Sequence, residues 1–224
     1  GRTMESVSLY EKYRPTKLSQ MAGQHKSIRK VRDITKRGWG GRAWWIEGAS
    51  GSGKTTLAKI IARMGADEFF IEEFGKPALL MEAAVQKGIE SAMQLSAWGK
   101  GGRAFIINEA HGLSKPSIHF LLDVLERIPK HVVFIFTTTA DGSQLFQDLQ
   151  GDAQPLLSRC IEIELDSGAP QQWAFAQFCK KIARKEGLDG APLQAYMDLA
   201  RDCQCNCRRM LQRIEANEMK KPKK

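Results

Sequence analysis

The segment Gly48–Thr55 reads Gly-Ala-Ser-Gly-Ser-Gly-Lys-Thr and matches the pattern GxxxxGK[ST] in full. Glycines let the backbone curl so that successive amides point at phosphate oxygens, and the N-terminus of a following helix adds partial positive charge. Lys54 is expected to neutralise the outer phosphates, Thr55 to bind Mg²⁺, and Thr56 to reach the α-phosphate. The residues predicted to contact the nucleotide here are Ser50, Gly51, Ser52, Gly53, Lys54, Thr55 and Thr56.

A second chemical element, Asn108-Glu109, directly follows the apolar run 104–107. A phosphate-binding loop of this type needs a carboxylate on a neighbouring strand to hold the metal's water shell, and a group that orients the attacking water. Glu109 is expected to polarise that water. Asn108 stands where an aspartate is expected at the metal, and an amide accepts hydrogen bonds but brings no charge. Two alternatives follow: weakened Mg²⁺ binding with slow hydrolysis, or a tolerated variant with full activity.

The elements that must position these residues are predicted by short apolar runs rich in β-branched and aromatic residues. Helical spacing separates the runs, as in Leu57, Ile60 and Ile61. Strands buried on both faces and alternating with helices predict an α/β fold with a parallel five-stranded sheet flanked by helices. The predicted strands cover residues 43–46, 69–71, 104–107, 132–136 and 161–165.

Beyond Leu165 the pattern becomes wholly helical. A helix is expected from Pro170 to Gly187, a second from Pro192 to Arg201, and a third with Cys207, Met210, Leu211 and Ile214 on one face. We therefore predict a nucleotide-binding α/β domain over residues 1–165 with a basic segment at 1–44, a small three-helix lid over 166–219, and a basic tail at 220–224.

Composition limits the class of protein. The 224 residues carry a net charge of +9 and 42% are hydrophobic, which excludes a disordered chain. No apolar run approaches the ~20 residues that span a bilayer, so no membrane association is expected. Residues 1–44 hold 11 Lys and Arg against 3 Asp and Glu. This segment either binds phosphates, of a nucleotide or of a nucleic acid, or is a solvated basic surface. The alternate spacing of Cys203, Cys205 and Cys207 suits neither a helix face nor a zinc knuckle, and favours small residues at a helix start.

The order of these motifs resembles the clamp-loader group of AAA+ ATPases, meaning replication factor C subunits and the bacterial DNA polymerase III gamma/tau type. The resemblance covers roughly residues 7–217 and is most specific at Tyr13-Arg14-Pro15 and Ser158-Arg159-Cys160. The segments that carry it are 10–15, 21–24, 108–111, 131–139, 157–160 and 206–211. The resemblance is to the ATPase core and lid, and the family's third helical domain, the collar, is not expected within these residues.

The resemblance implies a role for individual residues and implies ATP and Mg²⁺ as cofactors. Thr139 would be the sensor-1 residue, Arg208 the γ-phosphate sensor of the lid, and Arg159 a finger that reaches the neighbouring subunit's nucleotide. Together with Lys54 and Glu109 these form the predicted catalytic set. The residues that the resemblance places against the adenine are Tyr13, Arg14, Pro15, Gly23 and Gln24.

The function implied is an ATP-dependent subunit that loads a sliding clamp on primer–template DNA during replication. The implied partners are other AAA+ subunits in a homo- or hetero-oligomer, with five members expected, together with the clamp and the DNA. The implied location is the cytoplasm or nucleoid of a prokaryote or virus, or the nucleus of a eukaryote. Two alternatives stay open: a branch-migration or initiator-type DNA ATPase, and a nucleotide-binding subunit in which Asn108 weakens hydrolysis.

Overall fold

A computed structural model describes residues 7–220, so the predicted tail lies outside the described residues except for Lys220. The chain divides into two compact units, each described by itself below. The ATPase unit comprises residues 25–49 and 53–165; the helical unit comprises the described residues up to Gln24, residues 50–52, and the chain from Asp166 onward. Residues 7–24 thus group with the chain that follows Leu165.

The ATPase unit is built on a five-stranded sheet in the order β2-β3-β4-β1-β5. Each pair of neighbouring strands is parallel, which confirms the predicted fold class. The strands are β1 (Arg42–Glu47), β2 (Ile71–Phe74), β3 (Arg103–Ile107), β4 (Val132–Thr138) and β5 (Ile161–Glu164). Because all five run the same way, the loops that follow β1, β3 and β4 emerge at one edge of the sheet.

One strand prediction is wrong. Residues Glu68–Phe70 form a 3-10 helix, η2, and the strand begins only at Ile71. The apolar run was misleading because its two phenylalanines pack with another aromatic residue instead of entering the sheet: Phe70 meets Trp98 edge-on at 4.8 Å, and Phe69 stacks on Trp98 at 5.8 Å.

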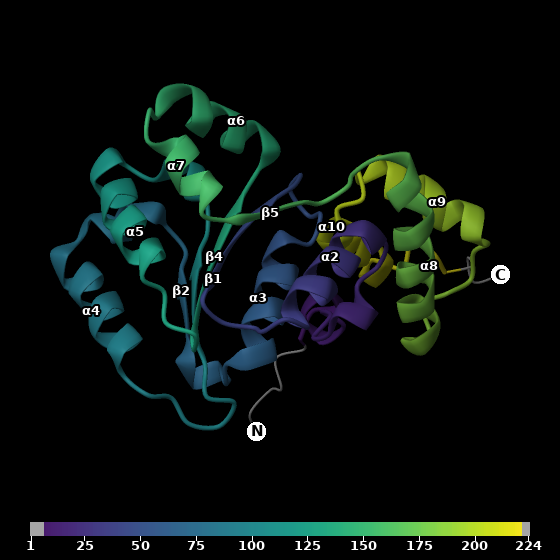
Figure 1. The fold of residues 1–224 in the computed structure, drawn as a ribbon. Helices are drawn as coiled ribbons and strands as arrows, with labels where there is room; N and C mark the ends of the chain where they lie inside the picture. Colours follow the sequence, from purple (N-terminus) through teal and green to yellow (C-terminus); the bar gives the residue numbers. More distant parts are fainter. Residues whose placement is uncertain (1–6, 221–224) are drawn as a thin grey trace, which may run out of the picture. The chain divides into compact units, whose positions relative to one another are not determined.

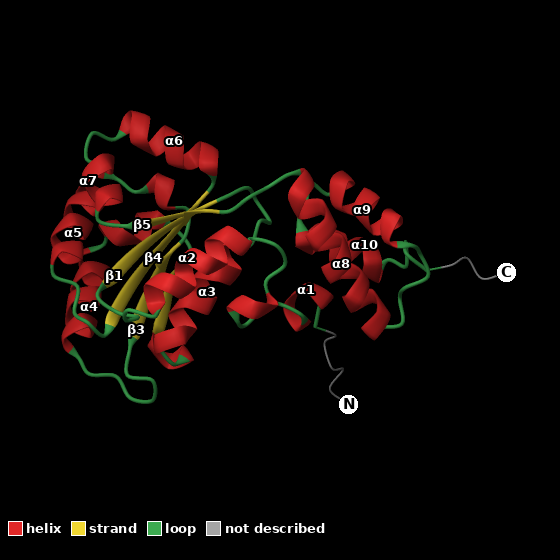
Figure 2. Cartoon of the chain, turned by 45° about the vertical axis from the view of Figure 1, so that its right-hand side comes forward, coloured by secondary structure: helices red, strands yellow, loops and turns green. Residues whose placement is uncertain are grey.

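Helices cover both faces of the sheet, as Figure 2 shows. On one face lie α2 (His25–Thr35) and α3 (Lys54–Gly65); on the other lie α4 (Ala83–Gln94), α5 (Lys115–Glu126), α6 (Ala140–Leu149) and α7 (Ala153–Ser158). Trp44 and Trp45 are adjacent in β1 and both are fully buried, since alternate side chains of a strand point to opposite faces. The ATPase unit also contains the short 3-10 turns η3 (Pro77–Met81) and η4 (Ala110–Gly112), and a further turn, η1 (Leu18–Gln20), belongs to the helical unit.

The helical unit contains α1 (Leu9–Lys12), α8 (Ala169–Lys185), α9 (Leu193–Asp202) and α10 (Cys207–Glu215), the last three being the helices predicted from sequence. Its core is formed by buried side chains that include Cys179, Tyr196, Met210 and Ile214. The arm that carries α1 is tied to α10, because the backbone amide of Leu9 donates to a carboxylate oxygen of Glu215 at 2.6 Å. No helix within residues 7–220 has the length and apolar character needed to cross a membrane.

Candidate nucleotide-binding site

The loop Gly48–Thr55 joins β1 to α3, the strand–loop–helix context that its motif requires. Gly51 and Gly53 have φ angles of 76° and 104°, in the left-handed region where a Cβ is unfavourable. A Cβ on Gly51 would also lie 2.6 Å from the side chain of Asn206. Ser52 is buried and its hydroxyl has no hydrogen-bond partner among the described residues. These features fit a loop that surrounds phosphate oxygens.

Lys54 opens α3 and folds back over the start of this loop. Its ammonium group donates to the carbonyl oxygens of Gly48 at 2.9 Å and Ala49 at 3.0 Å. Burial lowers the pKa of Lys54, and the nearby carboxylate of Glu109 partly opposes that shift. The Lys54 ammonium donates to uncharged carbonyl groups and forms no ion pair with a carboxylate among the described residues. Its positive charge is therefore available to bind a phosphate group.

Asn108 directly follows β3, and both the oxygen and the nitrogen of its side-chain amide form hydrogen bonds. The β3–β4 register sets Ile107 beside Phe136, so Asn108 and Thr137 come next to each other at the edge of the sheet. The Thr137 hydroxyl donates to the amide oxygen of Asn108 at 2.7 Å, and the amide nitrogen donates to Glu73 on β2 at 2.7 Å. A carboxylate therefore lies directly beside the uncharged residue.

Glu109 is 60% exposed and has a φ of 55°, which directs the residue out of the strand path. One of its carboxylate oxygens lies 3.5 Å from Nε2 of His111, whose Nδ1 is 2.8 Å from the Thr138 hydroxyl. The imidazole of His111 thus lies between the Glu109 carboxylate and the Thr138 hydroxyl. An exposed carboxylate at the carboxyl edge of the sheet can orient and polarise water.

Thr139, the predicted sensor-1 residue, caps a helix in the structure. Its hydroxyl accepts the backbone N–H of Gly142 at 3.0 Å and thereby satisfies the first turn of α6. The threonine that reaches Asn108 is Thr137, two residues earlier. A sensor role for Thr139 stays a prediction, and the hydrogen-bond geometry offers Thr137 as the residue in contact with the acidic element.

In the helical unit, Gly23 and Gln24 pack against the start of the segment that leads into α8 and do not form an open surface. Gln24 is buried, and its side-chain amide makes two hydrogen bonds with the backbone of Asp166, at 2.9 and 2.8 Å. Gly23 lies against Gln171 at the start of α8, where a Cβ would come within 2.0 Å of the Gln171 amide oxygen. That oxygen is buried without a partner among the described residues. It is an acceptor suited to a donor such as the exocyclic amine of a purine.

The structure separates Tyr13 from Gly23 and Gln24. The Tyr13 hydroxyl donates to Glu186, just beyond the far end of α8, at 2.5 Å. Along α8 the predicted adenine contacts are thus divided between the first turn and the last. The guanidinium of Arg208, the predicted lid sensor, lies 4.6 Å from the ring centre of Tyr10, and no carboxylate among the described residues pairs with it.

Arg159, the predicted finger, ends α7 in the ATPase unit. One guanidinium nitrogen donates to the carbonyl of Pro155 at 2.9 Å and another pairs with Glu126 at the end of α5. The side chain is 32% exposed. It precedes β5 by two residues and so lies at the amino-terminal edge of the sheet, opposite the edge that carries the loop after β1.

The fold and the loop define a P-loop ATPase. Residues 45–162 match the AAA family, described as the ATPase family associated with various cellular activities, and the chain belongs to that family. The chain is therefore an NTP-hydrolysing, nucleotide-binding enzyme, as predicted. No ligand is part of the structure; the glycine curl, the unpartnered Ser52 hydroxyl and the position of Lys54 fit nucleotide phosphates.

Relatives of known identity confirm the resemblance to the polymerase III type. The chain is 26% identical over 215 residues to the DNA polymerase III subunit gamma of Buchnera aphidicola subsp. Schizaphis graminum, covering 86% of this chain and 56% of that protein. It is 32% identical over 157 residues to the subunit gamma/tau of Mycoplasma genitalium, covering 58% of this chain and 25% of that protein. The chain thus spans about half the length, or less, of these relatives.

Solved structures share the fold. A point variant of RuvB from Thermotoga maritima superposes with a TM-score of 0.71 at 22% identity, over 91% of this chain and 64% of that one. A second point variant of the same protein gives a TM-score of 0.69. These likenesses establish the AAA+ architecture.

Sequence reasoning missed three residues that the structure brings to these sites: Glu73, Thr137 and Gln171. Glu73 was missed because β2 was placed too early. Thr137 could have been found from the strand register, since it follows the last apolar residue of β4 just as Asn108 follows the last of β3. Gln171 has no sequence signal, because only the positive φ of Gly23 brings it into contact.

Proposed function

We propose that this chain is an ATPase subunit of a clamp loader: with ATP and Mg²⁺ bound it joins other AAA+ subunits, opens a sliding clamp and places it on primer–template DNA. DNA then triggers hydrolysis, and hydrolysis releases clamp and DNA. The similarity to DNA polymerase III subunit gamma over 86% of the chain supports this assignment. The expected assembly has five subunits.

The observation that carries the proposal is the position of Arg159. The pairing of β5 with β1 sets Ile161 beside Trp44 and Glu164 beside Glu47. The phosphate-binding loop starts directly after Glu47, whereas Arg159 precedes Ile161, so the whole length of β5 separates them. A four-residue strand spans roughly 10 Å at 3.3 Å per residue.

Arg159 therefore cannot serve the loop of its own chain while β5 stays paired. Its partner Glu126 lies on α5 just before the chain enters β4, which is also at the amino-terminal edge. An arginine at that edge is suited to the nucleotide of a neighbouring copy, where it would stabilise charge on the transferring phosphoryl group. Such a finger raises turnover by ~10³–10⁵.

An exposed aromatic patch, formed by Phe69 and Trp98, offers a surface for the clamp. Their exposed fractions are 79% and 64%. The rings of Phe69 and Trp98 stack at 5.8 Å, so the patch is a preformed apolar surface. Large apolar side chains that gather on a surface mark sites of protein association. We assign the clamp to this patch because it is apolar, and the nucleotide to the polar loop.

The test is a complementation experiment with two inactive variants of the full chain. Arg159→Ala keeps its own loop but lacks the finger, and Lys54→Ala keeps the finger but lacks the loop's cation. Each alone is expected to lose the hydrolysis that clamp and DNA stimulate in the assembled complex. Mixed complexes should recover part of it, because an intact loop then faces an intact finger.

Arg127→Ala is the matched control, since Arg127 is an exposed arginine on the same unit that pairs with Asp123 and Glu90. It should leave stimulation unchanged. Unaltered turnover in Arg159→Ala, or no recovery in the mixture, would show that Arg159 does not act in trans. Native mass measurement of the assembly distinguishes a clamp loader from a branch-migration or initiator-type ATPase. Five subunits would support a loader, and six would support a ring of the other type.

A further inference from the structure

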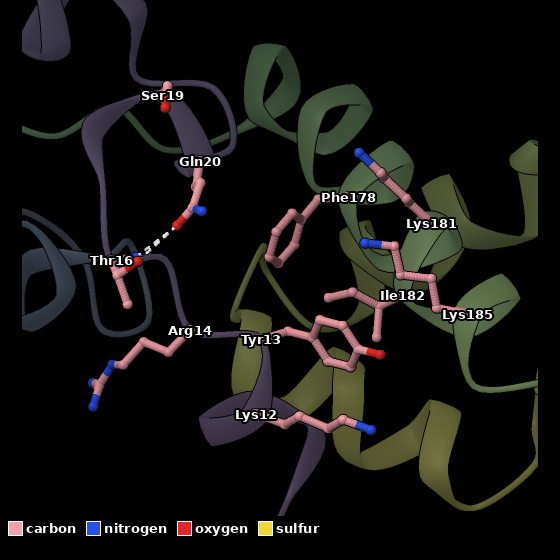
Figure 3. Close-up of a pocket in the computed structure, with 10 residues that line it drawn as sticks. All are labelled: Lys12, Tyr13, Arg14, Thr16, Ser19, Gln20, Phe178, Lys181, Ile182 and Lys185. Atoms are coloured by element: carbon pink, nitrogen blue, oxygen red, sulfur yellow. Dashed lines mark hydrogen bonds between the residues drawn. The ribbon is translucent and has the colours of Figure 1, made fainter.

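The helical unit contains a pocket of about 490 Å³. Tyr13 and Arg14, two of the residues predicted to lie against the adenine, are in its lining, whereas no residue of the phosphate-binding loop is. It lies between the N-terminal arm and the second half of α8, as Figure 3 shows. Four cationic side chains line it, Lys12 and Arg14 from the arm and Lys181 and Lys185 from α8, and no carboxylate is among its lining residues. Its volume is in the range of small-molecule sites, ~300–1,000 Å³.

Two of these charges are already balanced and two are not. Lys12 pairs with Glu186 at 2.6 Å, and Arg14 with Glu11 at 3.5 Å. Lys181 and Lys185 have no carboxylate partner anywhere in the described chain; the ammonium of Lys185 lies 5.9 Å from the ring centre of Tyr13. They stand one helical turn apart on α8, so their charges add on one wall of the pocket.

The side-chain amide of Gln20 adds one further donor to the wall. The amide oxygen of Gln20 is occupied by the backbone and hydroxyl of Thr16, at 2.9 and 3.1 Å, which leaves its NH₂ group for a ligand. Figure 3 shows the rings of Phe178 and Tyr13 and the side chain of Ile182 gathered between these groups. Ile182 is 3% exposed, so the pocket has an apolar floor beneath a cationic rim.

We propose that this pocket binds a nucleotide at its phosphate, with Lys181 and Lys185 on the phosphate oxygens and Phe178 beside the base. A phosphate monoester carries nearly two negative charges on three acceptor oxygens, which matches two unbalanced ammonium groups and an amide donor. Cationic walls with an aromatic side chain are the usual means of holding single-stranded nucleic acid. The nucleotide is either free or the 5′-phosphorylated end of a strand.

This site is distinct from the one that involves Gly23 and Gln171. Gln171 is in the first turn of α8 and Lys181 is ten residues on, which corresponds to roughly 15 Å along a helix. The proposal does not rest on clamp loading, because none of the residues that carry it belongs to the phosphate-binding loop or the acidic element.

The test uses methyl NMR signals of Ile182 and Thr16 in the full chain as local reporters. Thymidine monophosphate is titrated in one arm and a 5′-phosphorylated thymidine hexanucleotide in the other. We expect the Ile182 signal to shift and binding to weaken at least about tenfold in the double variant K181E/K185E. For a strand, the slope of log affinity against log salt should fall by about 0.7 for each phosphate that no longer meets a lysine.

The double variant K76E/K130E makes the same change of charge at two exposed lysines of the other unit and should bind as the unaltered chain does. K181Q/K185Q, which adds no negative charge, should also weaken binding. A shift with the monophosphate supports a free nucleotide; a shift with the hexanucleotide alone supports a strand end. The proposal is overturned if neither probe moves the Ile182 signal, if K181E/K185E binds like its control, or if only an acidic peptide binds.

Discussion

The hydroxyl of Thr137 donates a 2.7 Å hydrogen bond to the amide oxygen of Asn108 across the carboxyl ends of two neighbouring strands. The same amide donates to Glu73 at 2.7 Å. Three strands thus contribute one residue each to a continuous polar chain. Asn108, which is predicted to lie at the metal, connects the two neighbours. Its amide donates to one and accepts from the other, which an ionised carboxylate could not do.

Replacing Thr137 by Val should destabilise the ATPase unit and slow hydrolysis. Thr137 is buried, and the replacement removes the donor while keeping the shape, which leaves the Asn108 oxygen with one partner fewer. We expect the free energy of unfolding to fall by about 1–2 kcal/mol. Thermal unfolding and single-turnover hydrolysis measure the two effects. Thr137→Ser keeps the hydroxyl and should behave nearly as the unaltered chain; equal damage by both variants would point to packing instead.

Replacing Glu73 by Gln should raise the Mg²⁺ concentration that half-maximal hydrolysis requires, by about tenfold. Glu73 is the carboxylate in contact with Asn108 and also lies 3.8 Å from the Lys59 ammonium, and we expect it to supply the negative charge that the amide lacks. Glu72→Gln is the control, since Glu72 is adjacent, exposed, and on the opposite face of β2. A Mg²⁺ requirement that is the same in both variants would remove Glu73 from the metal site.

Replacing Glu109 by Gln should lower single-turnover hydrolysis by ~10²–10⁴ while nucleotide binding is retained, because the side chain is exposed and its expected task is to polarise water. Binding is followed by titration of a fluorescent ATP analogue. Loss of binding together with hydrolysis would indicate that Glu109 holds the site together rather than acting on water.

Asp189 makes the stability of the helical unit depend on acid pH. Burial by itself would raise the pKa of Asp189, but hydrogen bonds from Tyr196, Lys180 and the Ala191 amide outweigh it and lower the pKa from 3.8 to about 2. A depressed carboxyl pKa stabilises the folded state above the unfolded value, and that contribution is lost as pH falls from about 4 to about 2. Its size is about 2 kcal/mol.

Asp189→Asn should therefore lower the melting temperature at pH 7, and the difference from the unaltered chain should shrink as the pH approaches 2. Thermal unfolding across that range measures it. Asp198→Asn, at a 46% exposed residue of α9 that pairs with Arg201, should change little at either pH. A difference for Asp189→Asn that persists unchanged at pH 2 would rule out its charge as the cause.

Apolar periodicity reports burial, and glycine spacing reports where the backbone can curl. The sequence therefore allowed the sheet, the lid helices and the phosphate-binding loop to be predicted. It did not allow the contacts that define the sites to be predicted. The pairing of Asn108 with Thr137 depends on the register of β3 and β4. The two hydrogen bonds between the Gln24 side chain and the Asp166 backbone depend on the left-handed backbone at Gly23 and Gln24, whose φ angles are 64° and 57°.

The early placement of β2 shows how one local error propagates. Phe69 and Phe70 have strong strand propensity, yet their rings are used against Trp98. Moving the strand to Ile71–Phe74 brings Glu73 to the carboxyl edge of the sheet, where it meets Asn108. A carboxylate contributed by a residue 35 positions earlier thus lies beside the uncharged Asn108.

The strand that separates Arg159 from the loop after β1 has a consequence for how the enzyme responds to its own abundance. On the proposed arrangement a solitary copy holds nucleotide but turns it over slowly, since its finger and its loop are at opposite edges of one sheet. The rate per chain then climbs with concentration, and dilution alone switches it off. Copies that find no neighbour would spend almost no ATP.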